Sequence, residues 1–444
     1  MFNSFTLFRI LCVPCDAWRH RAIFFNGQID CRHGTYLTDQ AAAEKPSRFG
    51  EFSRVPRRVR WFIYLLSFSA IGYGYLTVII SAYLPERGMS PGSVGLILGA
   101  GGASLVVSAI PLGMLSDRIG RKWIFIAGTI MLIPALLAFA VTEEVSLLVL
   151  AGILGGVAEG GFLSTWNALI ADQTKGDERN AAFSLSFIVS NAAMGTGFAL
   201  PILFPPLQSA LSVDSHALHV AFIFITALLS IVTPIGSYYL LKDYKEIIKE
   251  KKSKGEKWDM KPLLKFSGIN SLIGLGAGFI IPLIPTWLFL KFGVPDTLSG
   301  PLLALSSLTI GLSAVASPLL ARRFGNIKAM VLTQALSTIF MLSLAFVMDP
   351  ITAGAFYLVR AALMNMSSPL GDSFLMGIVP PEQRGLASAV NSLIWRLPNS
   401  ASTVVGGMLL SSGEYSLPFF IATSFYIAAI ALFYLVFKDV KQTE

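Results

Sequence analysis

Three ionisable side chains, Glu159, Arg360 and Arg396, lie deep inside long apolar stretches of this sequence. A charge at the centre of a bilayer costs about 2.5–3.5 kcal/mol on insertion scales, so such a group faces a polar cavity or a partner of opposite charge. Glu159 is therefore one candidate for a proton-binding site. Alternatively, the two arginines bind an anionic substrate with Glu159 as their counter-ion, or the charges form a permanent structural ion pair. The residue types allow all three interpretations.

Asparagines lie near each of these charges and extend the candidate site. Asn167 follows the glutamate by about two helical turns, while Asn365 and Asn391 are each five residues from one of the arginines. That spacing is offset from a single helix face, so each amide either lines a shared cavity or packs between helices. Because the glutamate belongs to the first half of the chain and both arginines to the second, a pair between them would form or break when the halves move.

The stretches that carry these residues are long enough to cross a bilayer, which takes about 20 residues per helix. The 444-residue chain is 54% hydrophobic and only 14% charged, with a mean hydropathy of +0.66. This composition excludes a soluble enzyme, a nucleic-acid-binding domain and a disordered chain. Since the stretches do not alternate as barrel strands do, we expect an all-α integral membrane protein. The twelve predicted transmembrane helices span residues 61–84, 91–115, 123–141, 146–171, 181–205, 217–241, 264–290, 298–321, 327–348, 351–379, 386–411 and 417–437.

The distribution of basic residues predicts the orientation of these helices. Thirty of the 34 Lys and Arg residues fall on the side that holds both termini, and only Arg87 and Lys291 fall in loops on the other side. The excess of basic residues marks the cytoplasmic side. We therefore expect a multi-pass protein of the plasma membrane with both termini in the cytoplasm. The net charge of +8 then reflects topology and contact with anionic lipid, not a nucleic-acid partner.

The chain divides into four predicted parts, and two of them repeat. Residues 1–60 form a cytoplasmic segment without a recognisable period, and 242–263 form a basic cytoplasmic linker. Between and after these lie two six-helix bundles, 61–241 and 264–438. A single offset of 205 residues aligns Gly120 with Gly325 and Arg179 with Arg384. Repeats of this kind build transporters that hold their binding site between the halves.

The first segment holds all three cysteines of the chain. Cys12, Cys15 and Cys31 lie near His20 and His33, but the spacing is too loose to predict a zinc site, so we expect no metal. No phosphate-binding loop and no His-Glu-x-x-His motif occurs, and we expect neither an enzyme nor a cofactor. His216 and His219 lie at a predicted outer loop, where their spacing is interpreted as incidental.

One loop resembles a known signature. The segment after the second predicted helix resembles the loop 2–3 motif of the major facilitator superfamily, and its residues are Gly113, Asp117, Arg118, Gly120, Arg121 and Lys122. Ala171, Asp172 and Arg179 resemble the family's segment after helix 4, and the segment 380–385 resembles its counterpart after helix 10. The resemblance covers about residues 60–438. It implies two six-helix bundles around a central cavity, secondary transport without ATP hydrolysis, and a gating role for the loop.

Two departures from the family bear on the kind of transporter. Gly152 stands where many proton-driven members carry an arginine. The segment from Gly195 to Pro201 is a degraded form of the glycine-rich signature of drug/proton antiporters. The sequence therefore favours a secondary transporter of a small organic or anionic solute, working by alternating access with or without proton coupling. A multidrug/proton efflux antiporter and a non-transporting membrane receptor or scaffold are the alternatives. We expect the partners to be the solute and the bilayer, with the proton as a further partner if transport is proton-coupled, and the protein to be a monomer.

Overall fold

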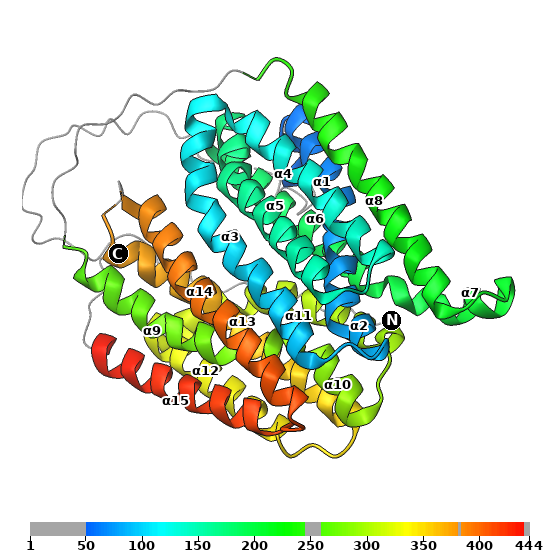
Figure 1. Ribbon diagram of the computed structural model, residues 1–444. Helices are drawn as coiled ribbons and strands as arrows, with labels where there is room; N and C mark the ends of the chain where they lie inside the picture. Colours follow the sequence, from blue (N-terminus) through cyan, green and yellow to red (C-terminus); the bar gives the residue numbers. More distant parts are fainter. Residues whose placement is uncertain (1–49, 245–258, 381–382, 439–444) are drawn as a thin grey trace, which may run out of the picture. The chain divides into compact units, whose positions relative to one another are not determined.

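The computed structural model describes residues 50–244, 259–380 and 383–438, and all of them belong to one compact unit, 49–444. Proline or a polar cap begins several helices: Ser90 and Asp214, for example, each accept a hydrogen bond from a backbone N–H of the first turn. In the first half (Figure 1) the helices are α1 (Arg57–Val78), α2 (Leu84–Glu86), α3 (Pro91–Ile119), α4 (Arg121–Val141), α5 (Val145–Asp172), α6 (Gly176–Ala199), α7 (Phe204–Leu211) and α8 (Ser215–Leu240).

The second half is built in the same way. Its helices are α9 (Lys261–Gly278), α10 (Ile284–Phe292), α11 (Asp296–Phe324), α12 (Asn326–Leu344), α13 (Pro350–Ile378), α14 (Arg384–Ser411) and α15 (Leu417–Phe437). Short breaks join three pairs of helices into single long segments. A π-helical segment, Ile79–Tyr83, connects α1 to α2, and 3-10 turns connect α6 to α7 and α9 to α10. The described helices thus occupy the positions of all twelve predicted spans.

Nine of the helical segments in the described part of the chain are long and apolar enough to cross a membrane, or ten if the two parts of α11 count as one span. The other two predicted spans correspond to α13 and α14, which carry Arg360 and Arg396. These charges and the asparagines beside them lower the mean hydropathy of both helices. The twelve-span prediction is consistent with the structure. Most of the predicted linker and residues 1–49, with the cysteine pattern, lie outside the described residues.

The repeat predicted from the sequence is visible in local geometry. Gly120 joins α3 to α4 with a φ of 109°, and Gly325 joins α11 to α12 with a φ of 77°. A side group at either position would be strained, so glycine is required at the same junction in both halves. Arg179 donates to the carbonyl oxygen of Ala171 at 3.1 Å, and Arg384 donates to that of Met376, also at 3.1 Å. Both bonds span eight residues, and the offset between them is again 205.

Small residues let the helices of the first half approach closely. A Cβ built on Gly156 of α5 would overlap the carbonyl oxygen of Gly101 and the hydroxyl of Ser104 on α3. One turn on, a Cβ on Gly160 would overlap the hydroxyl of Ser108. Stripes of small residues are a common way to pack helices in membranes. Gly156 and Gly160 therefore let α5 pack closely against α3.

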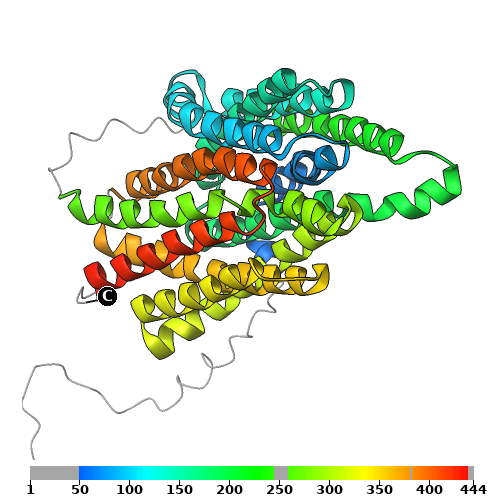
Figure 2. The same ribbon diagram turned by 60° about the horizontal axis from the view of Figure 1, so that its bottom comes forward.

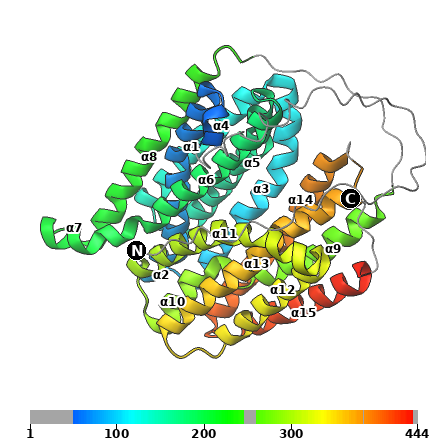
Figure 3. The ribbon, with the colours of Figure 1, turned by 180° about the vertical axis from the view of Figure 1, so that it is seen from behind.

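The two halves meet along α3 with α14 and along α6 with α11. Figure 2 shows α14, in orange, running beside α3, in cyan, and Figure 3 shows α6 beside α11. Near the start of α3, the N–H of Gly92 donates to the hydroxyl of Ser411 at 2.7 Å, and Thr286 donates to the carbonyl oxygen of Ser81 at 2.6 Å. We call the end of the molecule that holds these two hydrogen bonds the contact end. The opposite end, which carries the 113–122 segment, is the loop end.

Candidate functional site

A cavity of about 1230 Å³ lies among α1, α4, α5, α6 and α11. Most of its lining is aliphatic or aromatic, and Glu159 is the one charged side chain among the described residues that line it. Three residues of the second half, Ser307, Leu308 and Gly311, complete the wall. Both halves therefore contribute to one cavity, as the sequence led us to expect of a solute site. Its aromatic residues are Tyr73, Phe162, Trp166, Phe183 and Phe187.

Glu159 connects the two halves at this cavity. The hydroxyl of Tyr73 on α1 donates to Glu159 Oε2 at 2.5 Å, and Arg396 Nη1 on α14 lies 3.4 Å from Glu159 Oε1. The side chains of Glu159 and Arg396 are 22% and 39% exposed, so water still reaches the pair. The carboxylate is thus held from its own half by a phenol and from the other half by a guanidinium. The structure brings these two sequence-predicted residues together.

Arg360, by contrast, points away from this pair. Its side chain is 4% exposed, its Nη2 donates to the hydroxyl of Tyr426, and Nε has no hydrogen-bond partner among the described residues. Ser337 of α12 donates to its carbonyl oxygen at 3.0 Å. This face of α13 packs on α12, and the guanidinium reaches Tyr426 of α15, which is why Glu159 does not meet both arginines. No carboxylate pairs with this buried guanidinium among the described residues.

Of the three predicted asparagines, one lines the cavity and two do not. Asn167 lines the cavity with Glu159. Asn365 donates to the carbonyl oxygen of Ala361 in its own helix at 2.9 Å, and Asn391 accepts from the amide of Asn270 on α9 at 3.2 Å. Neither of these two belongs to the lining of the cavity. The sequence alone does not single out Tyr73, because a tyrosine in an apolar helix is as compatible with packing as with lining a site.

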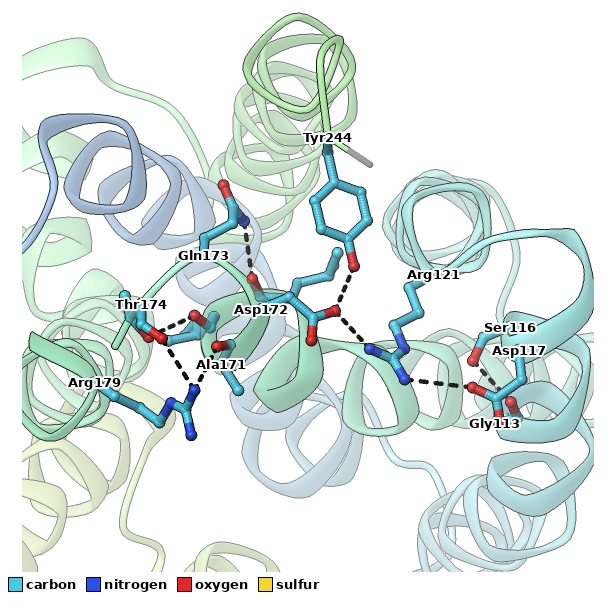
Figure 4. Close-up of polar contacts among 12 residues, drawn as sticks. Gly113, Ser116, Asp117, Arg121, Ala171, Asp172, Gln173, Thr174, Arg179 and Tyr244 are labelled. Carbon is cyan, nitrogen blue, oxygen red and sulfur yellow. Dashed lines mark hydrogen bonds and ion pairs between the residues drawn. The ribbon is translucent and has the colours of Figure 1, made fainter. Parts of the chain in front are cut away.

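The predicted gating loop forms a chain of polar contacts at the loop end, shown in Figure 4. Arg121 Nη1 lies 2.5 Å from Asp172 Oδ2 at the end of α5, and Arg121 Nη2 lies 3.5 Å from Asp117 Oδ1. The hydroxyl of Tyr244 donates to Asp172 Oδ2 at 2.6 Å. Burial raises the pKa of Tyr244 and the hydrogen bond to Asp172 raises it further, so the phenol stays protonated and keeps donating. These contacts join α3, α4, α5 and the segment after α8.

The remaining loop residues have simpler surroundings. Lys122 Nζ lies 4.6 Å from the centre of the Tyr238 ring, a cation–π contact, and Arg118 is exposed. A Cβ on Gly113 would meet only Ser164, at 3.7 Å. Gly113 therefore allows an ordinary approach of α3 to α5, while Gly120 supplies the turn. The partners described for Asp117, Arg121 and Lys122 all belong to the first half.

This architecture matches a known family over most of the chain. The family model described as the Major Facilitator Superfamily matches residues 61–272 and 266–444. The chain belongs to the Major Facilitator Superfamily. This is a family of membrane transporters, and the match confirms the family that the sequence resembled.

Individual members of the superfamily show how far the similarity extends. Over 176 residues the chain is 29% identical to the quinolone resistance protein NorA of Staphylococcus aureus strain MRSA252, and the match covers 40% of this chain but only 43% of NorA. A variant of the nucleoside transporter NupG has a TM-score of 0.70 at 16% identity, covering 85% of this chain and 100% of that one. An auto inhibited peptide transporter of the POT family has a TM-score of 0.69 at 14% identity, covering 88% and 98%. At such identities the structural likeness shows the fold.

The sequence did not predict one buried histidine–aspartate pair of this protein. His219 Nε2 lies 2.7 Å from Asp296 Oδ2, and these side chains are 0% and 2% exposed. The interpretation of His219 as incidental is therefore wrong. Its helix begins at the contact end, so the imidazole is enclosed between α8 and the start of α11 instead of facing water. An aspartate at the first position of an apolar helix was the one available signal in the sequence.

Proposed function

We propose that the protein is a secondary active transporter that moves a small organic solute by alternating access. Two observations carry this proposal. Both halves line one cavity, and Glu159 in its wall pairs with Arg396 of the second half, which lies outside the lining. A charged pair across a moving boundary forms in one state and separates in another. Binding a solute at this point can therefore shift the balance between the two states, as alternating access requires.

The contacts between the halves close one end of the molecule, and the basic residues indicate which side of the membrane that end faces. Hydrogen bonds from Gly92 to Ser411 and from Thr286 to Ser81 close the contact end. We assign the loop end to the cytoplasm, because it carries the large excess of Lys and Arg, and the membrane to the plasma membrane. The structure then represents a state closed toward the outside. Transport requires these bonds to break and the cavity to become accessible from the contact end.

The lining of the cavity favours an organic solute with an apolar body. Leu132, Phe162 and Trp166 offer apolar surface. Glu159 offers one charge, and Asn167 and Asn191 each offer an amide. Arg396 neutralises Glu159 when the cavity is empty, so a solute that binds either member of the pair must replace the other. An anionic solute would compete for Arg396, and a cationic one for Glu159. The proton is a third competitor for Glu159, which makes proton coupling part of the proposal.

Multidrug efflux is the second candidate. It is supported by the partial similarity to NorA, whose printed name is a quinolone resistance protein, and by the aromatic residues of the cavity. Wide, aromatic-lined sites accept solutes of varied shape because stacking and apolar contact demand little geometric precision. The degraded glycine-rich segment between Gly195 and Pro201 argues for the broader proposal of a solute transporter as the first choice.

Flux through purified protein in liposomes tests the proposal. Compounds that raise the melting temperature of the protein would first be collected from a panel of organic anions, cations and neutral amphiphiles. Their uptake would then be measured with and without a pH gradient. We expect accumulation for at least one ligand, and its loss in Glu159→Gln but not in Glu144→Gln, a matched change at an exposed carboxylate. Binding without flux for every ligand would instead indicate a receptor.

A further inference from the structure

His219 is enclosed at the contact end by residues of both halves. Its imidazole stacks on the ring of Tyr83 with centroids 3.6 Å apart and meets the edge of Phe204 at 4.6 Å. On the remaining side stands Asp296, the first residue of α11 in the second half, whose Oδ2 lies 2.7 Å from Nε2. The pair thus joins α8 to α11 across the boundary between the halves, in a place that excludes water.

The second ring nitrogen decides where the proton lies. His219 Nδ1 is 2.8 Å from the carbonyl oxygen of Ser215, an atom that can only accept a hydrogen bond. Nδ1 therefore carries a hydrogen, and Nε2 of a neutral imidazole would present a lone pair to the carboxylate of Asp296. Two lone pairs at 2.7 Å repel each other, so a proton must lie between these atoms. The pair holds one proton more than a neutral histidine and an ionised aspartate hold when apart.

A second carboxyl group lies beside the pair. Glu86 of α2 accepts a hydrogen bond from the backbone N–H of Asp296. The other titratable neighbours are two tyrosines and a histidine: Tyr75 donates to the carbonyl oxygen of His219 at 3.4 Å, and Tyr83 bonds His216 Nδ1 at 2.7 Å. In the described part of the chain no lysine or arginine bonds either carboxylate.

The nearest arginine is already engaged. Arg87 lies beside this cluster in sequence, but its guanidinium pairs with Glu143 at 3.0 Å, near the surface. The N-capping Asp214, at the start of α8, is occupied by the N–H of Ala217. The imidazole is thus the group that can offset the buried carboxylate of Asp296, and it does so only with the additional proton. Without it, a buried charge would stand unpaired, which is strongly unfavourable.

We propose that His219 and Asp296 form a proton-binding site that holds the contact end closed. Closing the two halves takes up one proton, and losing it favours separation of α8 from α11. This site rests on the alternating-access function proposed above, but it differs from Glu159 in place and role. Because it lies at the contact end, it exchanges its proton with the outer side and sets how readily that side opens. Acidification therefore favours the state seen here.

Distances between spin labels at the contact end test this site without any solute. Labels would be placed through Glu144→Cys and Met348→Cys, two exposed positions at the contact end of the first and second halves, in the full chain with its three cysteines changed to serine. We expect a short and a long distance whose ratio changes by up to about tenfold per pH unit, the limit for one linked proton. The short distance should dominate at low pH, because the closed state holds the additional proton.

Three variants identify the responsible group. In His219→Gln and Asp296→Asn an amide replaces one partner and can donate without an additional proton, so we expect the pH dependence of the ratio to disappear. His216→Gln, a change at the exposed histidine one turn away, should retain it. A ratio that does not change with pH in the native sequence would overturn the site. A pH dependence that survives in both pair variants would overturn it as well.

The outcome separates this site from the proposed function. If no solute crosses the membrane but the label distances respond to pH through His219, the transport proposal fails and the proton site stands. If solute flux is observed while the distances ignore pH, the proton site fails and the transport proposal stands.

Discussion

Arg396 of α14 lies 3.4 Å from Glu159 of α5, although 237 residues separate them in the sequence. The two side chains belong to different halves, and Tyr73 holds the glutamate on the opposite side. Both members of the ion pair are partly exposed to water. Ion pairs of this kind contribute at most about 1 kcal/mol to stability, because water screens the charges. The relationship therefore points to a role in transport more than in folding.

Removing either member of this pair should affect flux much more than stability. We expect Glu159→Gln and Arg396→Gln each to lower the rate of solute uptake by at least about tenfold, equal to about 1.4 kcal/mol in activation free energy. The melting temperature should change little in either variant. Uptake into liposomes and thermal unfolding of the same preparations measure the two effects. A large fall in melting temperature with normal uptake would favour the purely structural ion pair.

At the loop end, Asp172 and its partners should matter more for stability than the Glu159–Arg396 pair does. The Asp172 side chain is 8% exposed and accepts from both Arg121 and Tyr244. Asp172→Asn leaves these donors poorly matched, so we expect the free energy of unfolding to fall by about 1–3 kcal/mol. Asp117→Asn is the matched control, since that side chain is 68% exposed and should change stability by less than about 0.5 kcal/mol. Equal effects of the two changes in chemical denaturation would contradict this assignment.

Two adjacent glycines of α5 should respond differently to the same change. A Cβ on Gly156 overlaps the backbone of α3 at Gly101, whereas one on Gly155 meets only Ala135 Cβ at 3.8 Å. We expect Gly156→Ala to destabilise the protein by about 1–3 kcal/mol, the usual range for overpacking a tight contact. Gly155→Ala should be neutral or stabilising, because alanine favours the helix over glycine by about 1 kcal/mol. Similar melting temperatures for both variants would rule out close packing of α3 on α5.

The repeat predicts that two distant glycines are equivalent. Gly120 and Gly325 have φ values of 109° and 77°, a region that other residues rarely adopt. Changing either to alanine should cost about 1–2 kcal/mol of strain, by the penalty for a left-handed backbone. Gly113→Ala is the control, since its φ is helical and the added Cβ finds space. The prediction fails if either junction tolerates alanine as well as Gly113 does.

Arg360 allows its structural and binding roles to be separated. Because the guanidinium is buried without a carboxylate, replacing it with methionine removes an uncompensated charge, and stability should stay the same or rise. If Arg360 binds an anion, Arg360→Met should also weaken the shift in melting temperature caused by that anion. The shifts caused by neutral ligands should be unchanged. A marked loss of stability without any ligand would show that the hydrogen bond to Tyr426 dominates.

Local features of this protein could be read from its residues. The apolar stretches predicted helices that the structure contains, because a helix in lipid must satisfy its own backbone and so depends on the composition of a single segment. The correspondence of Gly120 with Gly325 and of Arg179 with Arg384 was equally accessible, although the hydrogen bonds of the two arginines were not predicted. A common offset of 205 was sufficient to relate them.

The sequence by itself determined that the chain is a twelve-segment membrane protein of two related halves, with a few charges that must find partners. Only the tertiary structure decided which partners those are. Arg396 reaches Glu159 while Arg360 faces α15, and His219 meets Asp296, 77 residues away. The direction of a side chain depends on how each helix is rotated and which helix packs against it. That choice is made by close contacts between small residues far apart in the chain, which no local pattern encodes.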